Sequence, residues 1–163
     1  MKVIIAIDQS AYWRQVIKSV AERHWPQGTT FRILTTISPF QWEHFTTPAW
    51  EKSMHDIRAA RIHAAQEILA EAKQILEKKF PTANVVTELD HGNAGGHIIH
   101  TAEEWQADKI VAGARNHSPD GEFGVVPNTI MFHAPCSVEL VKLPDATSDD
   151  IRKTLEHKAV LSR

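Results

Sequence analysis

The residues best suited to chemistry lie between positions 108 and 141. Asp108 to Gly113 contains a short apolar run, Ile110 to Ala112, ends on glycine and predicts a buried strand. A polar run follows, Gly124 opens a predicted helix, and Ser137 to Val141 predicts a last strand. A strand, a glycine-bearing loop and a helix N-terminus together favour phosphate binding, because unpaired backbone N–H groups converge there.

Composition narrows the classes of function. A chain of 163 residues with 42% hydrophobic and 23% charged residues is typical of one soluble globular domain. The net charge of −2 gives no electrostatic reason to expect nucleic-acid or membrane binding. A single cysteine excludes an internal disulfide and fits a reducing compartment. Because we find no charged-then-apolar leader and no long apolar run, we expect a cytoplasmic protein.

Apolar runs alternate with helical patterns along the chain. Residues 3–7 are continuously apolar, which indicates a strand covered on both faces. Strands are expected near residues 2–7, 30–37, 84–89, 108–113 and 136–142. Strands separated by helices imply right-handed βαβ units and a parallel sheet. The fold class is therefore α/β, with a single doubly wound domain of five strands and helices on both faces.

The intervening helices carry their own signals. Ser10 is a suitable cap for the first helix. The second is expected from about Trp50 to Lys79, ended by Pro81, with its apolar positions at helical spacing (Ala64, Ala65, Ile68, Ala72, Ile75 and Leu76). The third should bury Ile98, Ile99, Ala102 and Trp105.

The last twenty residues differ in composition from the rest. We expect a domain over residues 1–143 and a C-terminal extension over residues 144–163. The extension is polar, yet Ile151, Leu155 and Ala159 recur every four residues, which predicts a helix docked on the domain or on a second subunit. A frayed, solvated tail is the alternative.

Three segments, residues 3–10, 102–111 and 133–138, resemble the universal stress protein family. The similarity extends over about Lys2 to Lys142. It implies five parallel strands in the order 3-2-1-4-5 and a homodimer often formed through the fifth strand. It also implies no known single catalysed reaction. Some members bind ATP and others do not.

Members that bind ATP share a Gly-x2-Gly-x9-Gly-Ser/Thr pattern, from which this chain departs. By resemblance Gly113, Asn116, Gly124 and Val125 occupy its four defined positions. Valine has no hydroxyl to donate to phosphate, and asparagine tolerates positive φ less well than glycine. Seven residues separate Asn116 from Gly124, two fewer than the pattern has.

Charge in the same loop also opposes triphosphate binding. Asp120 and Glu122 place two carboxylates where an anion would lie, and Arg115 is the only fixed positive charge in this segment. The triphosphate half of the site is therefore expected to be weak.

The base and ribose half is better preserved. By resemblance Asp8 would accept hydrogen bonds from a nucleotide, with Ile7 and Thr36 forming the adjoining wall. Alternatively, Asp8 caps the following helix. The candidate nucleotide-binding residues are Ile7, Asp8, Thr36, Gly113, Asn116, Gly124, Val125 and Val126.

Other chemistry is less well supported. His97 and His100, with His91 nearby, lack the additional ligands that a metal site needs, so no metal is expected. Cys136 with His133 suggests a nucleophile and base only superficially, because the cysteine opens a predicted buried strand. We expect no catalytic residues. Trp42 and Trp50, if exposed, would form a partner or ligand surface.

The favoured function is a dimeric stress-response or signalling module with weak or no ATP binding that acts through protein partners. The alternative is an ATP- or AMP-binding universal stress protein that works as a nucleotide-dependent switch, with slow hydrolysis at most. A dedicated enzyme is least favoured, because no nucleophile–base or acid pair occurs at catalytic spacing. No cofactor is expected, although ATP or AMP is possible.

Overall fold

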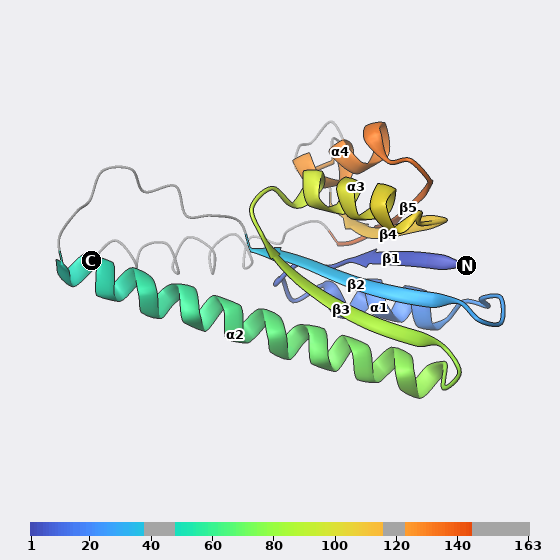
Figure 1. Cartoon of the computed structure of the whole chain (residues 1–163), viewed down its shortest axis with the longest axis horizontal. Helices are drawn as coiled ribbons and strands as arrows, with labels where there is room; N and C mark the ends of the chain where they lie inside the picture. The colour runs from blue at the N-terminus through green and yellow to red at the C-terminus, as the bar shows by residue number, and fades with distance from the viewer. Residues whose placement is uncertain (38–47, 116–122, 145–163) are drawn as a thin grey trace.

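Five parallel strands form one sheet in the order β3-β2-β1-β4-β5, with helices on both faces (Figure 1). The computed structural model describes residues 1–37, 48–115 and 123–144, and the side chains of all of these except residues 48–54. The elements are β1 (Lys2–Ala6), α1 (Trp13–Ala21), β2 (Thr30–Ile37), α2 (Pro48–Lys79), β3 (Asn84–His91), α3 (Ala94–Trp105), β4 (Lys109–Ala114), α4 (Val125–His133) and β5 (Ser137–Lys142). The predicted fold class and strand order are confirmed.

Two separate apolar layers hold the sheet between its helices. On β1, Val3 and Ile5 point into the layer shared with α1 and α2, whereas Ile4 and Ala6 point into the layer shared with α3 and α4. All four are buried. Successive side chains of a strand alternate between the faces of its sheet, so a strand buried on both faces is apolar throughout.

The first helix begins later than the sequence suggested. Its N-cap is Tyr12, which makes no side-chain capping bond, so the prediction that Ser10 caps this helix is wrong. Ser10 instead belongs to a turn fixed by Asp8. Its N–H and its hydroxyl both donate to Asp8 Oδ1, at 3.1 and 2.5 Å, and Ser10 Oγ accepts from Tyr12 N at 3.3 Å. Asp8 therefore orders the turn before the helix and does not cap the helix itself.

The long helix follows its predicted pattern with local shifts. It begins at Pro48, a residue suited to a first helical turn because its missing N–H has no partner there. The buried positions are Ala65, Leu69, Ala72 and Leu76. Ala64 is exposed and Leu69 takes the buried place that the sequence pattern did not assign.

In the third helix Ile98 and Ala102 are buried, as predicted, whereas Ile99 and Trp105 are only half-buried. Trp105 lies at the edge of its layer, where Arg32 and Lys2 pack over its ring.

Several expectations fall on residues outside the described ranges. These are the C-terminal helix of residues 145–163, the loop residues Asn116, Asp120 and Glu122, Trp42, and the side chain of Trp50. Within the described ranges, no helix combines the length and the apolar character needed to cross a bilayer.

Candidate functional site

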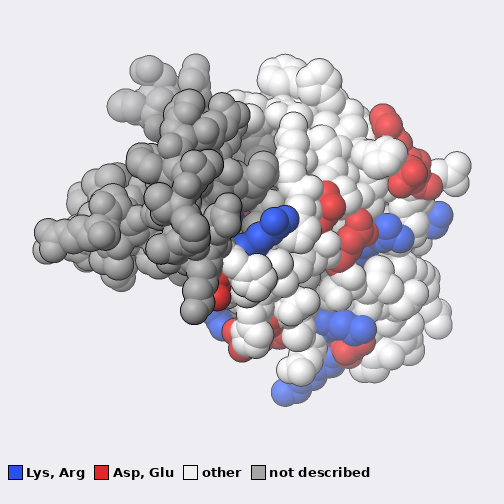
Figure 2. All heavy atoms as spheres, turned by 60° about the vertical axis from the view of Figure 1, so that its left-hand side comes forward, with Lys and Arg blue, Asp and Glu red and all other residues white. Residues whose placement is uncertain are grey.

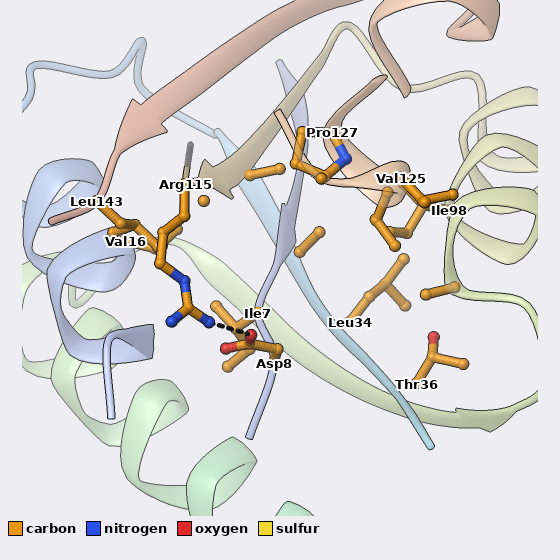
Figure 3. A pocket seen from close by; sticks show the side chains of 16 residues that line it. Ile7, Asp8, Val16, Leu34, Thr36, Ile98, Arg115, Val125, Pro127 and Leu143 are labelled. Carbon is orange, nitrogen blue, oxygen red and sulfur yellow. Dashed lines mark ion pairs between the residues drawn. The ribbon is translucent and has the colours of Figure 1, made fainter. Parts of the chain in front are cut away.

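A cavity of about 410 Å³ opens at the carboxyl-terminal ends of the central strands (Figure 3). The helices that follow β1 and β2 lie on one face of the sheet, and those that follow β3 and β4 lie on the other (Figure 1). The chain therefore diverges between β1 and β4, and such a divergence leaves a crevice at the strand ends. The volume falls within the range of small-molecule sites.

The structure brings most of the predicted nucleotide-binding residues to this cavity. Its lining includes Ile7, Asp8, Thr36, Gly113, Gly124, Val125 and Val126. The eighth, Asn116, lies outside the described residues. These positions lie in β2 and β4, directly after β1 and at the start of α4, so the fold assembles residues that are more than one hundred positions apart in sequence.

The floor of the cavity is apolar. Leu34 of β2, Ile98 of α3 and Ile7 line it and are buried. Sequence reasoning did not place Leu34 or Ile98 in the site. Leu34 lies two residues before Thr36 on the same strand, and side chains two residues apart share a face of the sheet, so this signal was available. Ile98 was predicted only as a helix core residue.

The polar rim of the cavity is formed by Asp8 and Arg115. Asp8 follows β1 and its side chain is 63% exposed, whereas the Arg115 side chain after β4 is 23% exposed. Arg115 Nη2 lies 3.8 Å from Asp8 Oδ2, and its guanidinium carbon lies 4.9 Å from the centre of the Tyr12 ring. Figure 3 shows Arg115 turned toward Asp8 across the cavity.

Gly113 has a packing role that the sequence did not reveal. An added Cβ would lie 2.7 Å from Leu143 Cδ1 and 3.1 Å from Val16 Cγ2. Leu143 is held there because its N–H donates to Ala114 O at 2.8 Å. A side chain at residue 113 would therefore have to displace the end of the Leu143 side chain, whether or not a ligand approaches the backbone.

The N-terminus of α4 offers an anion fewer donors than an ordinary helix start. Gly124 is the N-cap, and Val125 at the first helical position is 82% exposed. Pro127 has no N–H, and Asn128 N already donates to Gly124 O at 3.2 Å. The first turn therefore has the N–H groups of Gly124, Val125 and Val126 for a ligand, one fewer than a helix without proline.

Outside the cavity, His97 has a structural role. His97 bridges α3 to β3, with Nε2 at 2.9 Å from Glu88 and Nδ1 at 3.0 Å from Asp90. Among the described residues, no group of three or more His, Cys, Asp and Glu side chains is arranged to hold a metal ion. Burial, and then the charge of Asp108, raises the pKa of the Cys136 thiol above its ordinary value.

Charges on the surface are mixed in sign. On the face shown in Figure 2, basic and acidic side chains of the described residues lie among neutral ones and among one another. Elsewhere among the described residues, opposite charges form ion pairs, including Arg14 with Glu71 and Arg32 with Glu88. This part of the surface therefore does not carry a broad field of one sign.

Solved structures share this fold. UspA from Lactobacillus plantarum superposes with a TM-score of 0.67 at 22% identity, covering 86% of this chain and 97% of that chain. A universal stress protein family protein from Arabidopsis thaliana, with AMP bound, gives 0.65 at 13% identity, covering 93% and 98%. The Archaeoglobus fulgidus universal stress protein in complex with dAMP gives 0.58 at 20% identity, covering 87% and 98%.

A comparison with individually curated proteins found no match. The model of the universal stress protein family, in contrast, matches residues 1–142, which is most of the chain. The order of the strands is the one that the resemblance implied. The chain belongs to the universal stress protein family.

Proposed function

We propose that the protein is a dimeric stress-response module whose cavity binds a nucleoside monophosphate in preference to ATP. The observation that carries this proposal is the start of α4. There Val125 is exposed, and by resemblance it occupies the position of the hydroxyl residue of ATP-binding members, while Pro127 lacks a backbone N–H. The cavity and its apolar floor lie next to this start of α4, where phosphate binding is expected to be weak.

The rest of the cavity suits a base and a ribose. Leu34 and Ile98 provide an apolar surface on which a base can lie, and the exposed Asp8 carboxylate can accept hydrogen bonds from ribose hydroxyls. The Arabidopsis and Archaeoglobus relatives hold AMP and dAMP, which are nucleotides with one phosphate. These relatives support the ligand class proposed for this chain.

The weak affinity that we expect for ATP follows from the number of hydrogen-bond donors that the phosphate site has lost. A hydrogen bond to a charged group is worth about 1.5–3 kcal/mol. Loss of the hydroxyl at Val125 and of the N–H at Pro127 together reaches about 4 kcal/mol, which would take a micromolar site to about millimolar. A ligand with one phosphate is affected less, because it needs fewer of these donors.

The second part of the proposal is a homodimer formed through β5, which transmits its signal to a protein partner in the cytoplasm. Among the described strands β5 pairs only with β4. The backbone N–H and C=O groups of its other edge are therefore available to pair with another strand. Pairing two β5 edges about a two-fold axis would satisfy them. A C-terminal extension over residues 144–163 is proposed to add to that contact.

Isothermal titration with AMP, and with ATP and magnesium, tests the ligand proposal. AMP should bind more tightly than ATP, and a low-micromolar dissociation constant for ATP would refute the proposal. Val125→Ser should strengthen ATP binding by about tenfold. The matched control is Val125→Ala, which removes the same exposed side chain without adding a hydroxyl and should leave ATP binding unchanged.

A broader repair tests the location of the site. Asn116→Gly and two residues inserted after position 116, combined with Val125→Ser, restore the pattern of ATP-binding members. This variant should bind ATP more tightly than Val125→Ser alone. If it gains nothing, the phosphate site lies elsewhere and the alternative of a nucleotide-dependent switch at this cavity is refuted with it.

A further inference from the structure

Among the described residues, one basic side chain lines the cavity. Arg115 is the single Lys or Arg in that part of its lining, and it projects from the end of β4 toward the end of β1 (Figure 3). Its guanidinium packs against the face of Tyr12 and is mostly shielded from solvent. An anion that entered the cavity would therefore meet this charge in a partly desolvated setting, where electrostatic attraction is stronger than in water.

The pairing of Arg115 with Asp8 is loose. Their closest N and O atoms are 3.8 Å apart, beyond hydrogen-bonding distance. Arg14 provides the contrast, because its Nε and Nη2 donate to Glu71 at 2.7 to 3.0 Å in a bidentate arrangement. Asp8 directs its other oxygen to Ser10, so its carboxylate is already hydrogen-bonded. Asp8 therefore leaves the guanidinium N–H groups of Arg115 able to bind another acceptor.

We propose that Arg115 binds the phosphate of the ligand, exchanging its loose pair with Asp8 for a bidentate bond. The inference rests on the proposed function and deepens it, because it names the group that reads the phosphate. A guanidinium matches the spacing of two phosphate oxygens and makes two parallel hydrogen bonds. A side chain then supplies what the first turn of α4 has lost.

This arrangement gives Asp8 two opposing effects. Its carboxylate accepts hydrogen bonds from the ribose, which favours any nucleoside. The same charge attracts Arg115 and repels a phosphate a few ångströms away. The affinity ratio of AMP to adenosine isolates the phosphate contribution, because the base and the ribose are common to both ligands.

The experiment is a double-mutant cycle with that ratio as its readout. For the wild-type protein AMP should bind about tenfold to a hundredfold more tightly than adenosine. In Arg115→Met the ratio should fall to about one while adenosine affinity stays the same. Asp8→Asn should raise the ratio, and this rise should be smaller when Arg115→Met is also present, because only the direct repulsion between Asp8 and the phosphate is then relieved.

Two further variants serve as controls. Arg14→Met removes an equal charge that also packs over an aromatic ring, and it should leave the ratio unchanged because Arg14 does not line the cavity. Arg115→Gln removes the charge but keeps a polar side chain, and it should reproduce the loss if Arg115→Met unfolds.

Failure of the inference and failure of the proposed function give different results. If the wild-type protein binds neither AMP nor adenosine, the nucleotide function itself is refuted. If both bind with equal affinity, or if the ratio survives Arg115→Met and Arg115→Gln, the cavity still takes a nucleoside and the role of Arg115 is refuted.

Discussion

Replacing Gly95 by alanine should loosen the contact between α3 and α4, the two helices that flank the cavity. A Cβ at this position would lie 2.9 Å from Thr129 Cγ2 and 3.0 Å from Thr129 Cβ. The second atom is attached to the backbone of α4, and the Thr129 hydroxyl donates to Val125 O at 2.8 Å. Rotation of the threonine therefore cannot remove the clash, and one helix must move.

The expected loss of stability is the difference between two effects. Overpacking a tight contact costs about 1–3 kcal/mol. Alanine is better than glycine in a helix by up to about 1 kcal/mol, which offsets part of that cost. The net destabilisation should be about 1–2 kcal/mol, equivalent to a fall in Tm of roughly 2–8 °C for a chain of this size.

Gly96→Ala is the matched control. It lies one residue further along the same helix, and its added Cβ would meet only Asn93 side-chain atoms, the nearest at 3.6 Å, which is ordinary contact. This variant should be as stable as the wild type or more stable. Both variants are measured by thermal and urea unfolding. If Gly95→Ala is as stable as Gly96→Ala, the helices are not packed as closely as described. Thr129→Ala should restore part of the stability of Gly95→Ala.

Two further predictions concern the fifth strand and its start. Replacing Val138 and Leu140 together by lysine should convert a dimer into a monomer in light scattering, with circular dichroism confirming that the variant is folded; a dimer that persists in the folded variant would contradict the β5 interface. Because its pKa is raised, Cys136 should be alkylated by iodoacetamide with a rate midpoint above that of free cysteine, since less thiolate is present at each pH. Asp108→Asn should shift that midpoint down, and an unchanged or lower midpoint in the wild type would refute this account.

The sheet could be predicted from the sequence because its central strands are buried on both faces. Such strands are uniformly apolar, and their position does not depend on details of the turns. Their ends were harder to predict. β3 continues through Asp90 to His91, beyond its apolar part, because these residues pair with Thr36 and Ile37 of β2. Backbone pairing along the full length of β2 leaves no mark on the side-chain pattern of β3.

The site was predictable only as far as the resemblance extends. The notable omission is Leu143, which follows the last strand and is placed against Gly113 by its hydrogen bond to Ala114. That contact depends on the register between β4 and β5, which no local pattern encodes. The wrong assignment of Ser10 has a local cause, because its N–H and its hydroxyl both donate to Asp8, which holds Ser10 in a turn ahead of the helix.

The short segment Gly113-Ala114-Arg115 has two consequences for how this chain can hold an anion. Side chains two residues apart on an extended chain share a face, so Arg115 emerges on the side where Gly113 meets Val16 and Leu143. Packing thus favours a small residue at position 113, and the arginine reaches toward Asp8. A phosphate site built on one side chain differs from a backbone cradle. It can be removed by a single substitution, and it distinguishes a charged ligand from a neutral one without requiring a chain of several phosphates.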